Sequence, residues 1–193
     1  MSFIATPDWS TLPVPEDDGA ARHLPGLRLP PIPLVATDGL SVNLESLAGR
    51  VVLFIYPRTG VPDQPNPPGW DQIPGARGCT TQCNAFRDAF AELRALGVDH
   101  LYGLSTQSTA DQREMAERQR LPFPILSDEA FALTRALRLP TFEASGMTLL
   151  KRLTLIAQDA VIEQVFYPVF PPDQNAAEVA AWLRGNLSRC SGS

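Results

Sequence analysis

Cysteine and histidine are scarce in this sequence, which has three cysteines and two histidines among 193 residues. A small, odd number of cysteines in a chain of this size argues against a disulfide framework and makes a chemically used thiol the more informative interpretation. The histidines, His23 and His100, lie far from the cysteines in sequence, so a metal site lacks ligands. We therefore expect no structural disulfides and no bound metal.

An excess of positive charge and long apolar runs are also missing. The chain has 16 Lys and Arg against 21 Asp and Glu, a formal net charge of −5, whereas a nucleic-acid-binding face is basic. The longest apolar run, Val51 to Tyr56, is far too short to cross a bilayer. The N-terminus also lacks the basic start and apolar stretch of a secretory signal. We therefore expect a cytoplasmic protein without nucleic-acid or membrane partners.

The composition indicates one folded domain. Apolar residues make up 44% of the chain, which is enough for a core, and the length suits a single domain. Residues 1–25 hold four prolines and an acidic cluster without a hydrophobic period, which predicts an irregular extension lying over the domain. We expect the domain to span residues 26–187 and a short tail to span residues 188–193.

Predicted strands and helices alternate along the domain. The run Val51 to Tyr56 is β-branched and aromatic without alternation, which is typical of a central strand buried on both faces. The other predicted strands span residues 27–35 (an edge strand at best), 100–105, 123–126, 147–157 and 161–167. The predicted helices span residues 80–96, 110–120, 128–137 (capped by Ser127) and 175–187. This order predicts a three-layer α/β sandwich around a mixed sheet.

A proline-rich stretch, residues 60–78, separates the central strand from the next predicted helix. Structureless segments of this length are uncommon in compact domains and are often functional. Trp70 is expected to pack this loop onto the domain, with a cap over a site or an exposed binding surface as the alternatives. Whether the loop shields a site or contacts a partner stays open.

Cys79 stands where this loop meets the helix. A helix start has unpaired N–H groups and the positive end of the helix dipole, and both favour a thiolate. A free cysteine has a pKa of roughly 8.5, which a helix start or a nearby cation such as Arg77 lowers to about 3.5–7.5. Because the thiolate is the nucleophilic form, the sequence predicts a reactive Cys79.

Cys83 follows Cys79 by four residues, which places both on one face of an intact helix with roughly parallel Cβ vectors. A disulfide between them would require the first helical turn to loosen. The spacing therefore predicts a transient bond rather than a structural staple. Spacing alone leaves open that both cysteines are small buried hydrophobic residues.

The residues around Cys79 resemble the peroxiredoxins, in particular the peroxiredoxin Q or bacterioferritin comigratory protein subgroup. The resemblance covers about residues 27–184 and rests on Val51-Val-Leu-Phe-Ile-Tyr-Pro57, Gly78-Cys-Thr-Thr-Gln82 and Phe86-Arg87-Asp88. It implies a thioredoxin-like fold and the reduction of hydrogen peroxide and organic hydroperoxides without a metal or organic cofactor. Cys79 matches the family's peroxidatic cysteine.

The resemblance also implies a catalytic arginine. The family uses an arginine on a later strand to orient the peroxide and stabilise the thiolate, and the segment Lys151-Arg152-Leu-Thr-Leu-Ile156 resembles that strand. Arg152 is therefore our candidate. A solvated strand cation is the alternative, but the apolar surroundings of Arg152 favour a partner such as a buried thiolate.

The family motif Pro-x-x-x-Thr/Ser-x-x-Cys does not precede Cys79 directly. The segment Tyr56-Pro57-Arg58-Thr59 resembles its front half, and the following loop then looks like an insertion. If the loop closes back on itself, Pro57 and Thr59 are expected to flank Cys79. A strand stop and an ordinary turn residue are the alternatives.

The resolving cysteine departs from the family pattern as well. That cysteine often lies five residues after the peroxidatic one, a place taken here by Asn84, whereas the thiol of Cys83 comes one residue earlier. The resemblance therefore assigns the resolving role to Cys83, with Cys190 as the rival and a terminus without a role as the favoured interpretation of Cys190. A thioredoxin-type dithiol would reduce the disulfide. The family includes monomers and dimers, so the oligomeric state stays open.

Two other functions remain as alternatives at this point. A thioredoxin-like disulfide reductase shares the fold, but such proteins usually carry a CxxC motif, which this chain lacks. A redox sensor or interaction module would oxidise once and change its contacts without turnover.

Overall fold

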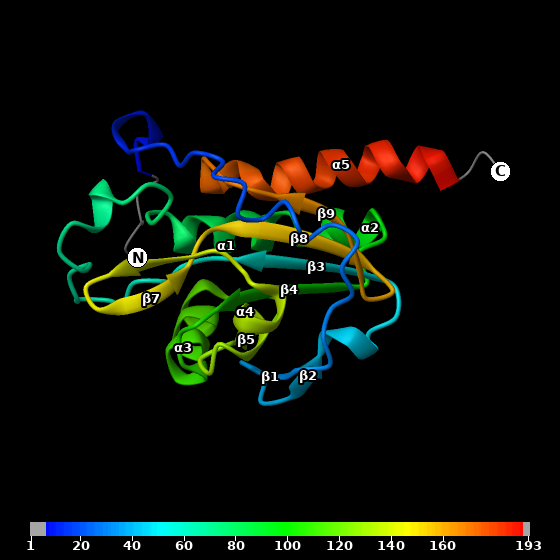
Figure 1. Cartoon of the computed structure of the whole chain (residues 1–193), viewed down its shortest axis with the longest axis horizontal. Coiled ribbons are helices and arrows are strands. Elements are labelled where there is room, and N and C mark those ends of the chain that lie inside the picture. The colour runs from blue at the N-terminus through cyan, green and yellow to red at the C-terminus, as the bar shows by residue number, and fades with distance from the viewer. Residues whose placement is uncertain (1–6, 191–193) are drawn as a thin grey trace.

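The computed structural model describes residues 7–190, and for residues 187–190 it describes the backbone alone. A seven-stranded mixed sheet lies at its centre, with the order β2-β1-β5-β4-β3-β8-β9 (Figure 1). Its strands are β1 (Pro33–Ala36), β2 (Ser41–Asn43), β3 (Arg50–Ile55), β4 (His100–Ser105), β5 (Ile125–Ser127), β8 (Leu153–Gln158) and β9 (Val161–Phe166). The helices are α1 (Cys79–Asp88), α2 (Phe90–Ala95), α3 (Thr109–Gln119), α4 (Ala132–Leu137) and α5 (Asn175–Cys190).

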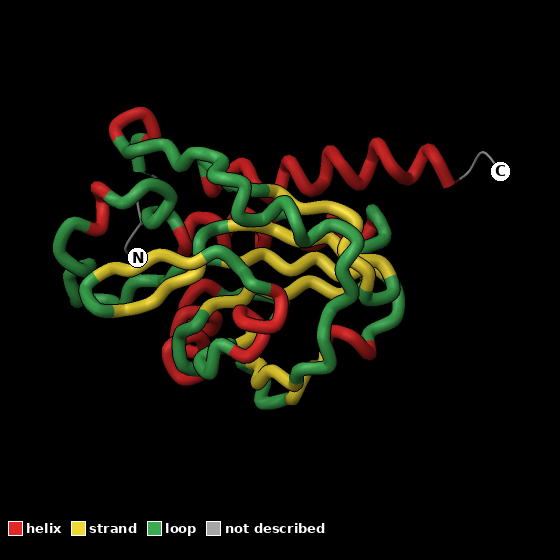
Figure 2. Tube along the Cα trace, viewed as in Figure 1, coloured by secondary structure: helices red, strands yellow, loops and turns green. Residues whose placement is uncertain are grey.

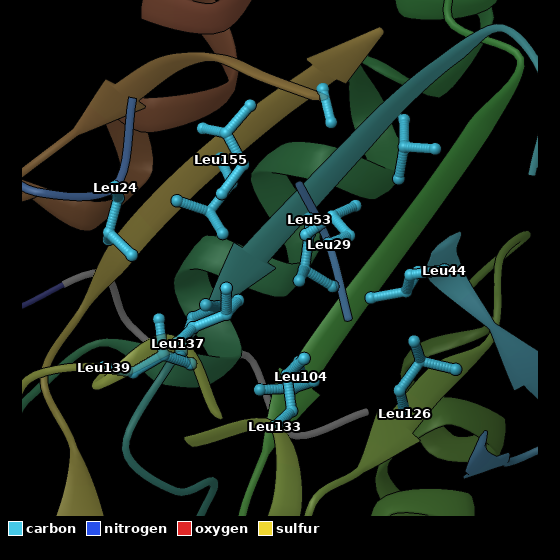
Figure 3. Packing of buried hydrophobic residues seen from close by; sticks show 14 of the residues in the cluster. Leu24, Leu29, Leu44, Leu53, Leu104, Leu126, Leu133, Leu137, Leu139 and Leu155 are labelled. Carbon is cyan, nitrogen blue, oxygen red and sulfur yellow. The ribbon is translucent and has the colours of Figure 1, made fainter. Parts of the chain in front are cut away.

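The predicted central strand is confirmed as β3, which pairs in parallel with β4 and antiparallel with β8. Its side chains alternate between two cores because successive residues of a strand point to opposite faces. Phe54 stacks on Phe86 of α1, with ring centroids 4.3 Å apart, in the core that α1 and α5 cover. Leu53 belongs to the opposite core with Leu133 and Leu137 of α4 (Figure 3). Helices therefore cover both faces, as the predicted three-layer α/β sandwich requires.

Two predicted elements are interrupted in the structure. The helix predicted over residues 80–96 is two helices, α1 and α2, which meet at Ala89. The strand predicted over residues 147–157 breaks at Lys151 and Arg152, which lie outside any strand. Its first part, β7 (Met147–Leu150), pairs with β6 (Thr141–Ala144) in a separate two-stranded sheet, while its second part is β8. The break matters because it places Arg152 between the two sheets.

Two further predictions are wrong in detail. The strand predicted at an edge over residues 27–35 is β1, which lies between β2 and β5. The N-cap residue of helix α4 is Phe131 rather than Ser127, and the upstream Asp128 carboxylate accepts the N–H groups of Leu133 (3.0 Å) and Thr134 (2.7 Å) in the first turn. Ser127 instead ends β5.

The described part of the N-terminal extension packs against the rest of the chain. It is almost entirely loop (Figure 2), apart from a short 3₁₀ helix, Trp9–Thr11. The indole of Trp9 donates to Asp173 (2.9 Å), and the Asp18 carboxylate accepts from Lys151 (2.6 Å) and the hydroxyl of Tyr167 (2.7 Å). These contacts hold the extension close to the start of α1 and to the β7–β8 break. Among the described helices, none has the length and hydropathy that crossing a bilayer requires.

Candidate active site

Cys79 is the first residue of α1 and is 4% exposed. Gly78 precedes it as the N-cap in the left-handed region (φ 99°), and no side chain caps the helix. A Cβ atom at position 78 would lie 2.7 Å from both Pro172 and Trp9, so only glycine fits this approach. The uncapped helix start leaves backbone N–H groups beside the position where a charge on the sulfur would develop.

Arg152 reaches Cys79 from the break between β7 and β8. Its Nη2 lies 3.2 Å from the Cys79 sulfur, and Arg152 as a whole is only 3% exposed. The same nitrogen lies 3.1–3.3 Å from the carbonyl oxygens of residues 75–77, which precede the helix. The structure thus brings together the cysteine and the arginine named from the sequence. Arg152 is no solvated strand cation.

Within the described residues, the surroundings of Arg152 hold no carboxylate to balance its charge. No carboxylate among the described residues pairs with Arg152, whose other partners are backbone carbonyls and the side-chain oxygen of Gln82. The Cys79 sulfur is therefore the one group bonded to this guanidinium, within the described chain, that can become an anion. A buried cation without a counter-charge is costly, and the sulfur 3.2 Å away is the group placed to supply one.

A buried amide network holds the other side of Arg152, and its members were not recognised in the sequence. Arg152 Nη1 donates to Gln82 Oε1 (2.5 Å), and Gln82 Nε2 donates to Asn175 Oδ1 (2.9 Å). The hydroxyl of Thr154 donates to the same Asn175 oxygen (2.7 Å). Gln82, Thr154 and Asn175 are all 0% exposed. The sequence offered one indication of this network: Gln82 is a polar residue three positions after Cys79, on a face of the helix that is otherwise apolar.

Thr59 is buried but its hydroxyl bonds elsewhere. The hydroxyl donates to Gln107 Oε1 (3.2 Å), which also accepts the Thr59 N–H (2.8 Å), and Gln107 Nε2 donates to the Thr59 carbonyl (3.2 Å). None of the hydrogen bonds of Thr59 reaches the Cys79 sulfur. The flanking residues Arg58 and Gly60, rather than Thr59, line the cavity at Cys79. Pro57 is buried at the end of β3, and its role stays a prediction.

Cys83 is 0% exposed and lies in the core among Phe54, Tyr56 and Phe86. Burial, together with the nearby charge of Cys79, raises the pKa of the Cys83 thiol far above its ordinary value. Both cysteines are free thiols. A Cys79–Cys83 bond therefore requires Cys83 to leave this core, which fits the predicted loosening of the first helical turn. The side chain of Cys190, the rival resolving residue, lies outside the described part of the chain.

A cavity of about 230 Å³ opens onto Cys79. The loop of residues 60–78 supplies much of its wall, including Val61, Pro62 and Trp70, and the cationic side chains of Arg58 and Arg118 also line it. Trp70 is 4% exposed and its ring centroid lies 6.3 Å from that of Phe142 in β6, so Trp70 packs the loop onto the domain as predicted. The cavity gives a small substrate access to the sulfur between apolar and positively charged walls.

The described residues contain no group of three or more His, Cys, Asp or Glu side chains that could hold a metal ion.

Comparisons with known proteins agree with this geometry. A model of the redoxin family matches residues 20–182. The chain is 25% identical over 190 residues to the chloroplastic peroxiredoxin Q of Oryza sativa subsp. japonica, covering 95% of this chain and 80% of the rice protein. It is 36% identical over 101 residues to peroxiredoxin Bcp of Escherichia coli, covering 52% and 54% of the two chains.

Solved structures show the same fold. Peroxidoxin BcpB from Mycobacterium tuberculosis superposes with a TM-score of 0.67 at 25% identity, covering 83% of this chain and 96% of that one. A peroxiredoxin Q from Xanthomonas campestris superposes with a TM-score of 0.66 at 24% identity, covering 82% and 96%. The predicted thioredoxin-like fold is thereby confirmed.

Proposed function

The chain belongs to the redoxin family, within its peroxiredoxin Q and Bcp group, and is a thiol peroxidase; from this premise we propose that Cys79 is the peroxidatic cysteine. The observation that supports this role is the buried contact of 3.2 Å between the Cys79 sulfur and Arg152, a guanidinium without a carboxylate partner among the described residues. The uncapped start of α1 adds backbone N–H groups at the same place.

In the proposed reaction, the Cys79 thiolate attacks one oxygen of a hydroperoxide. A sulfur–oxygen bond forms as the oxygen–oxygen bond breaks, and the sulfur loses two electrons to become a sulfenic acid. The other oxygen leaves as hydroxide or alkoxide and takes a proton from solvent. Arg152 and the N–H groups of the helix start stabilise the charge that develops on the oxygens. These steps use no metal and no organic cofactor.

Hydrogen peroxide and small organic hydroperoxides are the proposed substrates. The cavity of about 230 Å³ reaches Cys79, and its walls include the apolar side chains of Val61, Pro62 and Trp70. An alkyl group of a hydroperoxide would contact this apolar wall while the peroxide oxygens face the sulfur.

For recycling, we propose that Cys83 attacks the sulfenic sulfur, so that a disulfide forms and water leaves. The reaction requires the first turn of α1 to unwind, because Cys83 is buried in the core and its thiol pKa is raised there. A thioredoxin-type dithiol then reduces the disulfide by exchange. A cytoplasmic location, and a monomer or homodimer, stay parts of this proposal.

The first step is tested by stopped-flow consumption of hydrogen peroxide by the reduced protein. Cys79→Ser is expected to abolish fast consumption, while Cys190→Ser, the matched control, keeps it. A wild-type rate in Cys79→Ser would remove the assignment. Steady turnover with a thioredoxin system separates an enzyme from a sensor that oxidises once.

The recycling step is tested by mass spectrometry after one equivalent of peroxide. A Cys79–Cys83 disulfide is the expected product. A Cys79–Cys190 bond, or sulfenic acid alone, would contradict the resolving role of Cys83.

A further inference from the structure

We infer that Asn175 is a positioning residue of this site, which fixes the orientation of Gln82 and, through Gln82, the place of Arg152 beside Cys79. This inference rests on the proposed role of Arg152. It concerns three polar side chains from separate elements that meet in the core: Gln82 from α1, Thr154 from β8 and Asn175 from the start of α5.

The direction of the hydrogen bonds follows from Arg152. A guanidinium has five N–H donors and no acceptor, so the amide of Gln82 can face it only with its oxygen. The Gln82 oxygen accepts from Arg152 Nη1 at 2.5 Å. The NH₂ group of Gln82 must then point the other way, where it needs an acceptor of its own. Asn175 Oδ1, at 2.9 Å, is that acceptor.

The hydroxyl of Thr154 holds the Asn175 oxygen from a second side. It donates to Asn175 Oδ1 at 2.7 Å, so the oxygen of Asn175 lies between two donors. If the Asn175 amide were reversed, its NH₂ group would face the NH₂ group of Gln82, and neither could accept. The network therefore has one consistent arrangement, and in it the oxygen of Gln82 faces Arg152.

Burial makes other arrangements of these hydrogen bonds unfavourable. Gln82, Thr154 and Asn175 are 0% exposed, so water is not at hand to replace a lost partner. Asn175 Nδ2 is buried without a hydrogen-bond partner in the part of the chain that the structure describes, which costs free energy. The hydrogen bonds that Asn175 makes in this core are therefore those to its oxygen, and one of them orients the amide of Gln82.

The network affects how the Arg152 guanidinium is oriented. Gln82 holds Nη1 of Arg152, which leaves Nη2 directed to the Cys79 sulfur at 3.2 Å. Without the Asn175 oxygen, the Gln82 amide is free to rotate and to present its NH₂ group to the guanidinium, which repels it. Arg152 then loses its partner at Nη1 and keeps only the carbonyl oxygens of residues 75–77 beside the sulfur, so its place at Cys79 is less well defined although neither residue has changed.

The test compares two substitutions of Asn175. Asn175→Leu keeps the branching at Cγ in a somewhat larger side chain but removes the acceptor, and it is expected to lower the second-order rate constant for hydrogen peroxide about tenfold, the size typical of losing a residue that orients a functional group. It should also lower the ultraviolet thiolate absorbance of the reduced protein at neutral pH. Asn175→Asp keeps an acceptor oxygen, so it should retain more of the rate constant than Asn175→Leu. Because its carboxylate adds a buried negative charge near Arg152, the rate constant rather than the thiolate absorbance is the readout for this variant. Asn186→Leu, in the same helix and bonded to a backbone carbonyl of that helix, is the matched control.

A double variant distinguishes positioning from a loss of stability. If Asn175 acts through Arg152, adding Asn175→Leu to Arg152→Gln should slow the reaction no further. A wild-type rate constant in a folded Asn175→Leu variant, or a further loss in the double variant, overturns the inference. If Arg152→Gln itself keeps the wild-type rate, the proposed role of Arg152 fails instead.

If Asn175→Leu does not fold, a substitution of Thr154 tests the inference instead. Thr154→Val changes the volume little and frees the Asn175 oxygen from one of its two donors. A lower rate constant with reduced thiolate absorbance is expected. A wild-type rate constant in Thr154→Val overturns the inference.

Discussion

The guanidinium of Arg152 lies 3.2 Å from the sulfur of Cys79, although 73 positions separate the two residues in the chain. Two local departures from regular structure make this contact possible. The left-handed conformation of Gly78 starts α1 at Cys79, and the break between β7 and β8 frees Arg152 from the strand ladder. The charge pair at the site therefore depends on where regular structure stops.

Replacing Arg152 with lysine tests whether the charge alone is sufficient. A lysine keeps the positive charge but has one nitrogen, so it cannot bond Gln82 and the sulfur with separate nitrogens. We expect Arg152→Lys to lower the rate constant for hydrogen peroxide about 10²-fold, the usual effect of losing one donor to a developing oxyanion. Stopped-flow measurement with the reduced protein checks this value. Lys151→Gln changes the neighbouring cation, which bonds Asp18, and serves as the control; equal rates in Arg152→Lys and wild type would contradict the prediction.

The raised pKa of the Cys83 thiol predicts a loss of stability at alkaline pH. Burial keeps this thiol protonated in the folded protein, whereas a cysteine in the unfolded chain ionises near pH 8.5, at about its ordinary pKa. Above that pH the unfolded state holds fewer protons than the folded state. The free energy of unfolding should then fall by up to about 1.4 kcal/mol per pH unit from this group. Below about pH 8 the contribution is fully present.

Cys83→Ala removes the titrating group and provides the comparison. Urea unfolding of both proteins between about pH 7.5 and 10 should give a smaller alkaline slope for the variant. Buried tyrosines add to the slope in both proteins equally and cancel in the difference. Equal slopes in the two proteins would show that Cys83 has the same pKa in the folded and the unfolded state, which would contradict the effect of its burial.

Trp9 should report the unwinding of α1 during disulfide formation. Its ring lies against Gly78, since a Cβ at that position would be 2.7 Å from the ring. The first turn of α1 cannot unwind without changing the surroundings of Trp9. The chain has three tryptophans, so Trp70→Phe and Trp182→Phe leave Trp9 as the single emitter.

In that double variant, peroxide should produce a fluorescence change at the rate at which the Cys79–Cys83 disulfide appears in quenched samples. Adding Cys83→Ser prevents the disulfide and should remove this phase. The same phase in the protein with Cys83→Ser would mean that Trp9 senses sulfenic acid rather than unwinding.

The sequence was sufficient to predict the parts of this fold that depend on local composition. The apolar run Val51 to Tyr56 identified the central strand because no other arrangement buries it on both faces. Cys79 was placed at a helix start because the proline-rich loop ends there and apolar spacing begins. Resemblance, rather than pattern, identified Arg152.

What the sequence did not show depends on contacts between distant segments. The break at Arg152 carries no glycine or proline, so the apolar stretch around it was predicted as one strand. Gln82 and Asn175 are 93 positions apart, and no local pattern pairs two amides over that distance. Thr59 bonds Gln107 because the two residues follow the neighbouring parallel strands β3 and β4, a pairing that only the folded structure shows.

Gly78 offers a test of how tightly the helix start is held, with Gly97 as a matched control. Both glycines have positive φ, +99° and +86°, so alanine at either position should cost about 1–2 kcal/mol of stability for the backbone conformation. Apart from its two chain neighbours, no described residue has an atom within 4 Å of a Cβ added at Gly97. A Cβ added at Gly78 would lie 2.7 Å from Pro172 and from Trp9. Gly78→Ala should therefore destabilise more than Gly97→Ala.

The same clash should reach the chemistry, because moving the start of α1 moves the Cys79 sulfur relative to Arg152. Urea unfolding and the rate constant for hydrogen peroxide, measured on both variants, separate the two effects. We expect Gly97→Ala to lose stability but keep its rate constant, and Gly78→Ala to lose both. If Gly78→Ala kept the wild-type rate constant, Trp9 and Pro172 would have to give way without moving the helix, and the position of Cys79 would not depend on the close approach at Gly78.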